Sequence, residues 1–503
     1  MKGQSIGQGV LFLTVFGALA QVLGFGYRVI MSRMVGAEVM GLFQLVMSAY
    51  GVIQSLTMIG LTAALSNLTA RELAQGNTLG AAQIRGTCLR VFFILLLPVG
   101  LITVLGSDAI SVYLLGDART QLGLMLLIPC AALTGIENLH KNIFYGAGKP
   151  KGPAVAEVVE QLVRAAAVLG LLYLFLPQYP ERVVGLIVLG MVLCEVVSAL
   201  TLLGMYRYYR AKQRLTGPGE SKGQRWHQIT AIAIPVGVNA LTGTLLGAAN
   251  SALLPQKLLE GGMDRAQAMS QLGVVTGMTL PMLAVPTVFL GAINLMLMPK
   301  LAAASALGQR GEVGKLTAEG MKVVSRLAFP VMTMMVVLGK DFGLALFKRE
   351  DVGNFLLPLA GATLMSCLCS VLIGVLNSIG KQSLVASISI LGGVVQLICT
   401  LLLAALPGVG IRGYVFGMVL AFVLEVGAYL FFVEKHTGTK TDWFSWFLAP
   451  ALASSLAGAT SNLLIGCLKG AGCIVPVADG AGVVLALIQY MTALYVLSGG
   501  REE

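Results

Sequence analysis

Two arginines lie near the start of the chain, in a stretch that is otherwise apolar and long enough to cross a bilayer. Arg28 follows Gln21 by seven residues, so both side chains share one face of a helix, whereas Arg33 is five residues further and points elsewhere. A guanidinium cannot lose its proton, and inside a membrane it needs an anion, water or lipid headgroups. Arg28 is therefore a candidate for binding an anionic group, and we expect Arg33 to reach the headgroups.

Uncharged polar residues form stripes on three further apolar segments. The second segment carries Gln44, Ser48, Gly51 and Ser55, spaced by four, three and four residues. A segment near 229–250 carries Asn239, Thr242 and Asn250, and one near 271–298 carries Thr276, Thr287 and Asn294, with Pro281 and Pro286 predicting a kink. Two interpretations stay open: hydrogen bonding between helices with close glycine packing, or a shared water-filled cavity that these segments line with the first one.

A charged pair falls inside a further apolar segment. Glu160 and Arg164 are four residues apart with the acid first, which is the favourable order for an ion pair within a helix. The pair is either structural or a coupling site for a cation. Glu195 and Glu425 are single acids in other segments, and each either carries a proton or contacts a neighbouring helix.

The sequence contains no recognisable catalytic constellation. Gly146 to Pro150 and Gly380 to Gln382 resemble fragments of a phosphate-binding loop, but both lack the four-residue spacer and the Ser or Thr after Lys. The three histidines have no metal-ligand companion at helical spacing, and no Ser-His-Asp or Cys-His nucleophile is recognisable. We expect no catalytic residue, no metal ligand, no cofactor and no enzymatic activity.

The composition defines the class of protein that must position these residues. Of 503 residues, 56% are hydrophobic, 11% are charged and 62 are glycine. A soluble domain of this length needs more charge to cover its surface. The sequence therefore predicts an all-α, polytopic membrane protein, and we expect it to be a monomer with a retained first span. The net charge of +11 fits basic cytoplasmic loops and need not indicate a nucleic-acid partner.

Apolar segments of about 20 residues predict about fourteen transmembrane helices. They lie near 6–35, 41–65, 88–106, 121–145, 154–176, 183–206, 229–250, 271–298, 323–342, 355–379, 383–406, 410–433, 444–468 and 479–497. Lys and Arg favour one set of connecting loops roughly two to one, which predicts that both termini are cytoplasmic. Cys467 and Cys473 flank the last predicted outer turn, and their spacing alone leaves open whether they form a disulfide.

The two halves of the chain are related by a repeat. A shift of 232 residues places Arg33 on Arg265, Gly41 on Gly273 and Gly148 on Gly380. Six predicted helices separate equivalent points, so the halves have the same topology and form a parallel repeat. The predicted domains are an N-terminal six-helix lobe at 1–206, a cytoplasmic linker at 207–228, a C-terminal six-helix lobe at 229–433, and two extra transmembrane helices at 434–503.

A family resemblance becomes specific at these residues. Leu23-Gly-Phe-Gly-Tyr-Arg28, the stretch from Ser32 to Phe43, and the stretch from Phe144 to Arg164 resemble the stage V sporulation protein B family. That family belongs to the multidrug/oligosaccharidyl-lipid/polysaccharide (MOP) exporter superfamily and is related to MviN-type lipid II flippases. The resemblance covers the first twelve predicted helices.

The resemblance implies a flippase in the bacterial cytoplasmic membrane, with two six-helix lobes that alternate access to a lipid-diphosphate-linked sugar. It places Arg28 at the position of the family's cavity arginine, so that Arg28 binds the diphosphate. We expect the polar contacts with the headgroup to come from Gln21, Gln44, Ser48, Asn239, Asn250, Thr276 and Asn294. Relatives often have Arg at the position of Gln21 and an acid at that of Asn250, so an Asp-based ion-coupling site is not expected there. The coupling ion, H⁺ or Na⁺, stays open.

Two alternatives remain at this point. A cation-coupled multidrug exporter, or an exporter of another polysaccharide precursor, belongs to the same superfamily, but a drug exporter would use a more acidic and aromatic cavity. A membrane enzyme or scaffold that does not transport would keep its polar residues at one membrane interface.

Overall fold

The computed structural model describes residues 6–219 and 221–497, and in this part of the chain every regular element is a helix. The chain divides into two compact units, residues 1–273 and 274–503, which we describe separately. Thirteen helical segments of the described chain are long and apolar enough to cross a membrane. This confirms the predicted all-α, polytopic class.

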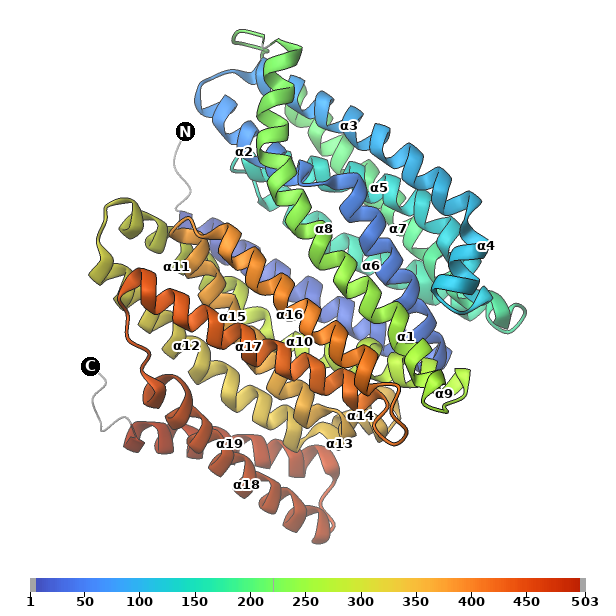
Figure 1. The fold of residues 1–503 in the computed structure, drawn as a ribbon, viewed down its shortest axis with the longest axis vertical. Coiled ribbons are helices and arrows are strands. Elements are labelled where there is room, and N and C mark those ends of the chain that lie inside the picture. The colour runs from blue at the N-terminus through green and yellow to red at the C-terminus, as the bar shows by residue number, and fades with distance from the viewer. Residues whose placement is uncertain (1–5, 220, 498–503) are drawn as a thin grey trace. The chain divides into compact units, whose positions relative to one another are not determined.

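The first unit consists of long helices joined by short turns (Figure 1). Its elements are α1 (Ile6–Met58), α2 (Leu61–Ala74), α3 (Thr78–Leu105), α4 (Ser107–Ala109), η1 (Ile110–Leu114), η2 (Ala118–Thr120), α5 (Gln121–Gly146), α6 (Lys151–Phe175), η3 (Pro180–Arg182), α7 (Val183–Ala211), α8 (Lys222–Glu260) and α9 (Arg265–Leu272). Helix α5 packs against α3 and α7, α6 packs against α7, and α1 packs against α6, α8 and α9.

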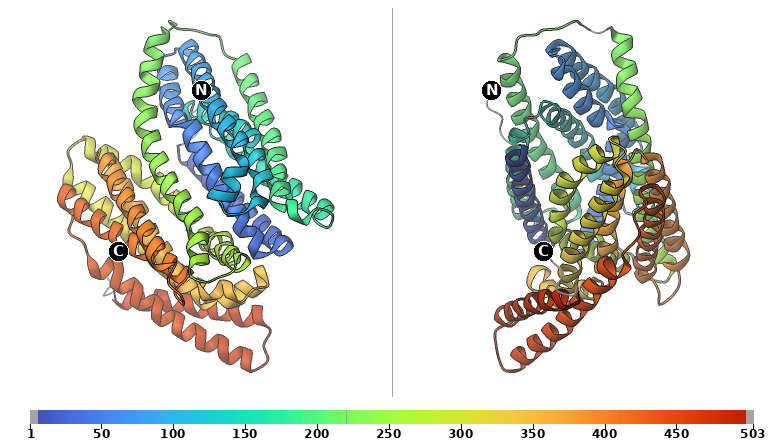
Figure 2. Two further views of the ribbon diagram at one scale, coloured as in Figure 1. Left: turned by 45° about the vertical axis from the view of Figure 1, so that its right-hand side comes forward. Right: turned by 90° about the vertical axis from the view of Figure 1, so that its left-hand side faces the viewer.

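The second unit has the same all-helical construction. Its elements are η4 (Gly273–Thr279), α10 (Leu280–Ala284), η5 (Val285–Val288), α11 (Phe289–Ala306), α12 (Arg310–Val337), α13 (Gly339–Phe342), η6 (Gly343–Phe347), α14 (Asp351–Asn354), α15 (Leu356–Ser378), α16 (Gln382–Leu403), α17 (Ile411–Thr437), η7 (Phe444–Leu448), α18 (Ala449–Gly470) and α19 (Val475–Leu497). Helix α15 packs against α11, α12 and α17, and α18 and α19 form a hairpin beside α12 (Figure 2).

Helix α1 contains the first two predicted spans. Gly36 has φ 78° and ψ 173°, which kinks the helix between the predicted spans 6–35 and 41–65. The apolar segment Thr14–Met58 has 45 residues, roughly 68 Å of helix, and so is long enough for two crossings. The predicted end of the second span at 65 is wrong, because Ile59 and Gly60 have positive φ and end α1 before the separate helix α2.

Two glycines of the predicted repeat meet at the crossing of α1 with α9 and the start of η4. A Cβ at Gly41 would lie 2.1 Å from the carbonyl oxygen of Met269, and a Cβ at Gly273 would lie 1.9 Å from that of Ala37. Each pair of positions, 41 with 273 and 37 with 269, differs by 232 residues. The contact is therefore reciprocal, as expected where a two-fold axis relates two equivalent helices. The predicted domain boundaries themselves remain a prediction.

Candidate functional site

Arg28 lies on the first half of α1, on the part of the helix that packs against α6. The two helices approach closely: a Cβ at Gly24 would lie 3.1 Å from Oε1 of Gln161. The Arg28 side chain is half-buried, and among the described residues it forms no salt bridge and no hydrogen bond. Arg164 of α6 is the neighbouring charge, and its positive field acts on both Tyr27 and Arg28. Arg28 is thus a cation within a membrane-length helix that the described protein does not neutralise by direct contact.

The other predicted residues of α1 fall on both sides of the kink. Gln21 is exposed, whereas Gln44 and Ser48 are half-buried on the second half of the helix. Ser48 Oγ donates to the Leu45 carbonyl at 2.7 Å. Further along the same stripe, Ser55 Oγ donates to Thr244 Oγ1 of α8 at 2.9 Å. This end of the stripe therefore packs between helices, as the first of the two sequence interpretations describes.

The remaining predicted residues are spread over both units. On α8, Asn239 is exposed, and Asn250 is buried with its Nδ2 donating to the Leu246 carbonyl at 3.2 Å. Thr276 lies half-buried in the π-helical turn η4 of the second unit. Asn294 lies on α11 and lines a cavity described below. Their roles in binding a cargo stay predictions.

A buried ionic cluster joins α5, α6 and α7. Arg164 forms a salt bridge with Glu160 and a second one of 3.1 Å with Glu195. Lys141 lies 2.6 Å from a carboxylate oxygen of Glu137 and 3.4 Å from one of Glu160. The predicted Glu160–Arg164 pair is therefore one part of a five-residue network. We call these five residues the ionic cluster.

Sequence reasoning missed the α5 half of the ionic cluster. Glu137 and Lys141 have the same acid-first spacing of four residues as Glu160 and Arg164, so the signal was present. The three carboxylates of the cluster bring one oxygen each within 4.8 Å of one another. Because Lys141 and Arg164 already contact these carboxylates, a metal ion would have to compete with two fixed positive charges.

A second charged contact lies next to the kink of α1, where Asp117 directly precedes the membrane-length segment Ala118–Gly146. Arg119 contacts Glu38 at 2.7 Å and Asp117 at 2.9 Å. Burial acts to raise the pKa of Asp117, but hydrogen bonds and positive charge from Arg119 outweigh it and hold this pKa below its usual value. This contact fixes the chain just after Gly36 to the turn before α5.

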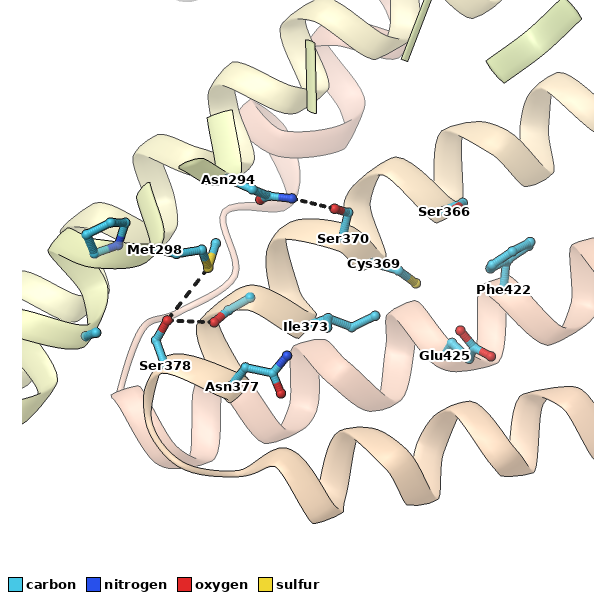
Figure 3. Close-up of a pocket in the computed structure, with 13 residues that line it drawn as sticks. Asn294, Met298, Ser366, Cys369, Ser370, Ile373, Asn377, Ser378, Phe422 and Glu425 are labelled. Atoms are coloured by element: carbon cyan, nitrogen blue, oxygen red, sulfur yellow. Dashed lines mark hydrogen bonds between the residues drawn. The ribbon is translucent and has the colours of Figure 1, made fainter. Parts of the chain in front are cut away.

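The second unit contains a cavity of about 730 Å³ between α11, α15 and α17, with a mainly apolar wall that also carries several polar groups (Figure 3). Asn294 Nδ2 donates to Ser370 Oγ at 2.8 Å on its wall, and the Oδ1 of Asn294 is a buried acceptor with no hydrogen-bond partner among the described residues. Phe422 and Glu425 of α17 lie at the opposite end of the labelled group (Figure 3). Amide, hydroxyl, aromatic and carboxylate groups together suit a polar ligand that carries hydroxyl or amino groups.

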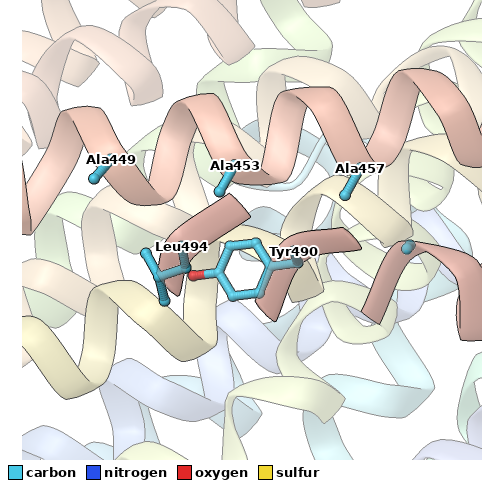
Figure 4. Packing of buried hydrophobic residues seen from close by; sticks show 6 residues of the cluster. Ala449, Ala453, Ala457, Tyr490 and Leu494 are labelled. Carbon is cyan, nitrogen blue, oxygen red and sulfur yellow. The ribbon is translucent and has the colours of Figure 1, made fainter. Parts of the chain in front are cut away.

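A largely apolar cavity of about 420 Å³ lies between α12, α18 and α19. Beside it, three alanines of α18 face Tyr490 and Leu494 of α19 (Figure 4), and Tyr490 Oη donates to the Arg326 carbonyl of α12 at 2.9 Å. This hydrogen bond satisfies the one polar atom of the tyrosine and fixes the hairpin to α12. The cavity is built to accommodate hydrocarbon rather than a polar group.

A family described as polysaccharide biosynthesis protein matches residues 6–300, which is more than half of the chain. The chain belongs to this family. Stage V sporulation protein B from Bacillus subtilis (strain 168) is 24% identical to this chain over 436 residues, which cover 84% of the chain and 82% of the relative. The lipid II flippase MurJ of the same organism is 21% identical over 458 residues, which cover 86% and 83%.

Solved structures of transporters share the fold of this chain. The lipid II flippase MurJ in an inward closed conformation matches with a TM-score of 0.73 over 97% of this chain and 98% of that chain, at 10% identity. An inward-facing multidrug resistance MATE family transporter of the MOP superfamily matches with a TM-score of 0.65 over 87% and 96%, at 16% identity. The resemblance noted in the sequence is therefore confirmed. The chain is a multi-pass membrane protein, and its fold is that of solved flippases and transporters.

Proposed function

We propose that this protein is a flippase that moves a lipid-diphosphate-linked sugar of the lipid II type across the bacterial cytoplasmic membrane by alternating access. Arg28 carries this proposal, because it is a half-buried cation in a membrane-length helix and has no acidic contact in the described part of the chain. A diphosphate offers the negative charge and the paired oxygens that match a planar guanidinium. One of the relatives, the lipid II flippase MurJ, supports the same cargo class by its name.

The remaining parts of the cargo have polar and apolar partners in the chain. Amides and hydroxyls suit the many hydroxyl groups of a sugar, and the residues proposed to contact the headgroup besides Arg28 are Gln21, Gln44, Ser48, Asn239, Asn250, Thr276 and Asn294. The prenyl chain would occupy the apolar cavity between α12, α18 and α19.

The deciding experiment is translocation of lipid II in proteoliposomes. Arg28→Ala removes a charge-assisted hydrogen bond worth ~1.5–3 kcal/mol, so we expect translocation at limiting cargo to fall about 10- to 100-fold. Arg28→Lys keeps the positive charge but lacks the paired N–H donors of the planar guanidinium, so this variant should retain part of the translocation activity. Arg33→Ala is the matched control, because Arg33 is an exposed arginine on the same helix. Full translocation by Arg28→Ala would refute the proposed cargo site.

The biological role is tested separately. We propose that the protein serves spore cortex synthesis, with both termini in the cytoplasm. Expression in a Bacillus subtilis strain that lacks stage V sporulation protein B should restore cortex formation, and the Arg28→Ala variant should not. Restoration of vegetative wall synthesis alone, in a strain depleted of its lipid II flippases, would contradict the sporulation role and keep the flippase activity.

One observation favours a second candidate, a cation-coupled exporter of organic cations. The cavity between α11, α15 and α17 contains the carboxylate of Glu425 together with Phe422, a pair suited to an organic cation. Drug sensitivity of a strain without the gene decides between the two candidates. Increased sensitivity that Glu425→Gln fails to complement would favour the drug exporter, whereas unchanged sensitivity with accumulated lipid-linked precursor favours the flippase.

A further inference from the structure

Three arginines lie together at one end of the first unit, on the two helices that flank α5. Arg85 lies seven residues after the first residue of α3, and Arg207 and Arg210 lie within the last five residues of α7. Helix α5 packs against both of these helices. Because α3 begins and α7 ends here, and both are long enough to cross a membrane, the arginines lie close to the depth of lipid headgroups.

Arg85 is held in place by two neutral side chains. Its guanidinium carbon lies 4.3 Å from the ring centroid of Tyr206, and its Nη1 lies 3.2 Å from Nε2 of His140. Nδ1 of His140 lies 2.7 Å from the Ile136 carbonyl oxygen, which can only accept, so Nδ1 carries the proton and Nε2 accepts from Arg85. His140 is therefore neutral, and it orients the guanidinium without balancing its charge.

The two arginines of α7 add positive charge at the same point. Arg210 follows Tyr206 by four residues, so it lies on the face of α7 that carries the ring beneath Arg85. The positive charges of Arg207 and Arg210 both act on Arg85. Both side chains are exposed, whereas Arg85 is half-buried. A group that arrives from outside can therefore reach all three arginines.

No acid in the described ranges pairs with these three cations. None of them forms a salt bridge there, and Nε of Arg85 is buried without a hydrogen-bond partner. The stretches 73–107, 138–156 and 196–219, which contain the neighbouring parts of α3, α5 and α7, have no Asp or Glu. The three positive charges thus repel one another unless an anion binds between them.

The acid closest to Arg85 along the chain is engaged elsewhere. Glu72 is only 1% exposed, and its Oε2 accepts a hydrogen bond of 2.6 Å from Nδ2 of Asn77. The electrostatic neighbours of Arg85 are instead the tyrosine ring beneath it and the two arginines of α7. An anion at this point must therefore come from outside the chain.

We propose that Arg85, Arg207 and Arg210 form a binding site for a phosphate group, which we call the arginine site. A phosphate carries negative charge and offers several oxygen atoms, which match several guanidinium N–H donors. Two sources supply this chemistry at a membrane surface: the headgroup of an anionic phospholipid and a soluble phosphate. The arginine site does not include Arg28, and the inference does not rest on the proposed function.

Binding is tested by calorimetric titration of the full-length, delipidated protein in a neutral detergent. The probes are dioctanoyl phosphatidylglycerol, dioctanoyl phosphatidylcholine and inorganic phosphate. We expect one site per protein for phosphatidylglycerol or for inorganic phosphate, with an affinity that falls as sodium chloride screens the arginines. Arg85→Gln should lower this affinity about 10- to 100-fold. Arg85→Lys keeps the charge but lacks the planar donors, so it should lose part of the affinity.

Arg182→Gln is the matched control. Arg182 also lies over a tyrosine ring, that of Tyr179 at 5.6 Å, but it has an acidic neighbour, Glu181, at 3.8 Å. It directly precedes α7 and so lies at the other end of that helix. This variant should bind the probes as the unmodified protein does.

A double variant keeps the test valid if Arg85→Gln does not fold. Arg207→Gln combined with Arg210→Gln changes two exposed side chains, so we expect the protein to fold and its affinity for the phosphate probe to fall about 10- to 100-fold. Unchanged affinity in this double variant would overturn the proposal. Arg28→Ala should leave binding at the arginine site unchanged, so failure of the cargo site and failure of the arginine site are observed separately.

The three probes identify the source of the phosphate. Binding of phosphatidylglycerol without binding of inorganic phosphate assigns the arginine site to a lipid headgroup. Comparable binding of inorganic phosphate assigns it to a soluble phosphate, and either result supports the proposal when the arginine variants weaken it. Equal binding of phosphatidylglycerol and phosphatidylcholine without binding of inorganic phosphate, or no binding of any probe, would overturn the proposal.

Discussion

Removing the charge of Arg164 should destabilise the first unit strongly. Arg164→Met keeps much of the side-chain volume but leaves Glu160 and Glu195, which are 7% and 3% exposed, without their guanidinium. Breaking a buried pair by removing one partner costs about 3–5 kcal/mol. We expect a loss of this size in the free energy of unfolding, measured at pH 8 by titration with sodium dodecyl sulfate in mixed micelles and followed by circular dichroism.

Three comparisons make this prediction specific. The control Arg349→Met removes a pair with Asp351 whose side chains are 36% and 40% exposed, so its cost should stay within about 0–1 kcal/mol. Adding Glu160→Gln to Arg164→Met should recover part of the loss, because it removes one of the unpaired carboxylates. The loss should also shrink at lower pH, where protons replace the missing cation. If Arg164→Met costs no more than Arg349→Met, the assigned role of the ionic cluster is wrong.

Three further predictions address other parts of the chain. Gly41→Ala would place a Cβ 2.1 Å from a carbonyl oxygen of α9 and should cost about 1–3 kcal/mol of unfolding free energy, whereas Gly17→Ala has no heavy atom within 4 Å and should not destabilise. The folded state lowers the pKa of Asp117, so the ionised carboxylate stabilises the fold above the usual aspartate pKa of about 3.9, and this stabilisation is lost as the pH falls below that value. The difference in unfolding midpoint between the native protein and Asp117→Asn should therefore shrink in acid. A difference that stays constant with pH would contradict this prediction. Cys467 and Cys473 are exposed free thiols at the α18–α19 turn, so a membrane-impermeant maleimide should label them in intact cells, and labelling only after permeabilisation would contradict cytoplasmic termini.

The helices were predictable because the bilayer imposes a simple length rule on apolar sequence. The predicted span 121–145 corresponds to Gln121–Gly146, and 356–378 differs from the predicted 355–379 by one residue at each end. The errors arise where the backbone changes direction inside apolar sequence. Ile59 and Gly60 end α1, but their residue types are equally common inside membrane helices, so composition does not reveal the end of the helix.

The candidate site was only partly predictable, because charge compensation depends on neighbours from other helices. Spacing within one helix identified Glu160 with Arg164, but the contact of Arg164 with Glu195 on α7 requires the packing of two helices. The same limit applies to Arg28: the sequence shows a cation in an apolar segment, and only the fold shows which neighbours it has. The reciprocal Gly41–Gly273 contact, in contrast, agrees with the shift of 232 residues read from the sequence.

That glycine contact also has an evolutionary consequence. Each glycine makes room for the backbone of the helix that carries the other, so neither position can gain a side chain unless the opposite helix moves away. A single helix crossing thus imposes one shared steric constraint on two residue positions that are 232 residues apart in the sequence. The two positions therefore cannot change independently, and among relatives they should covary as one site.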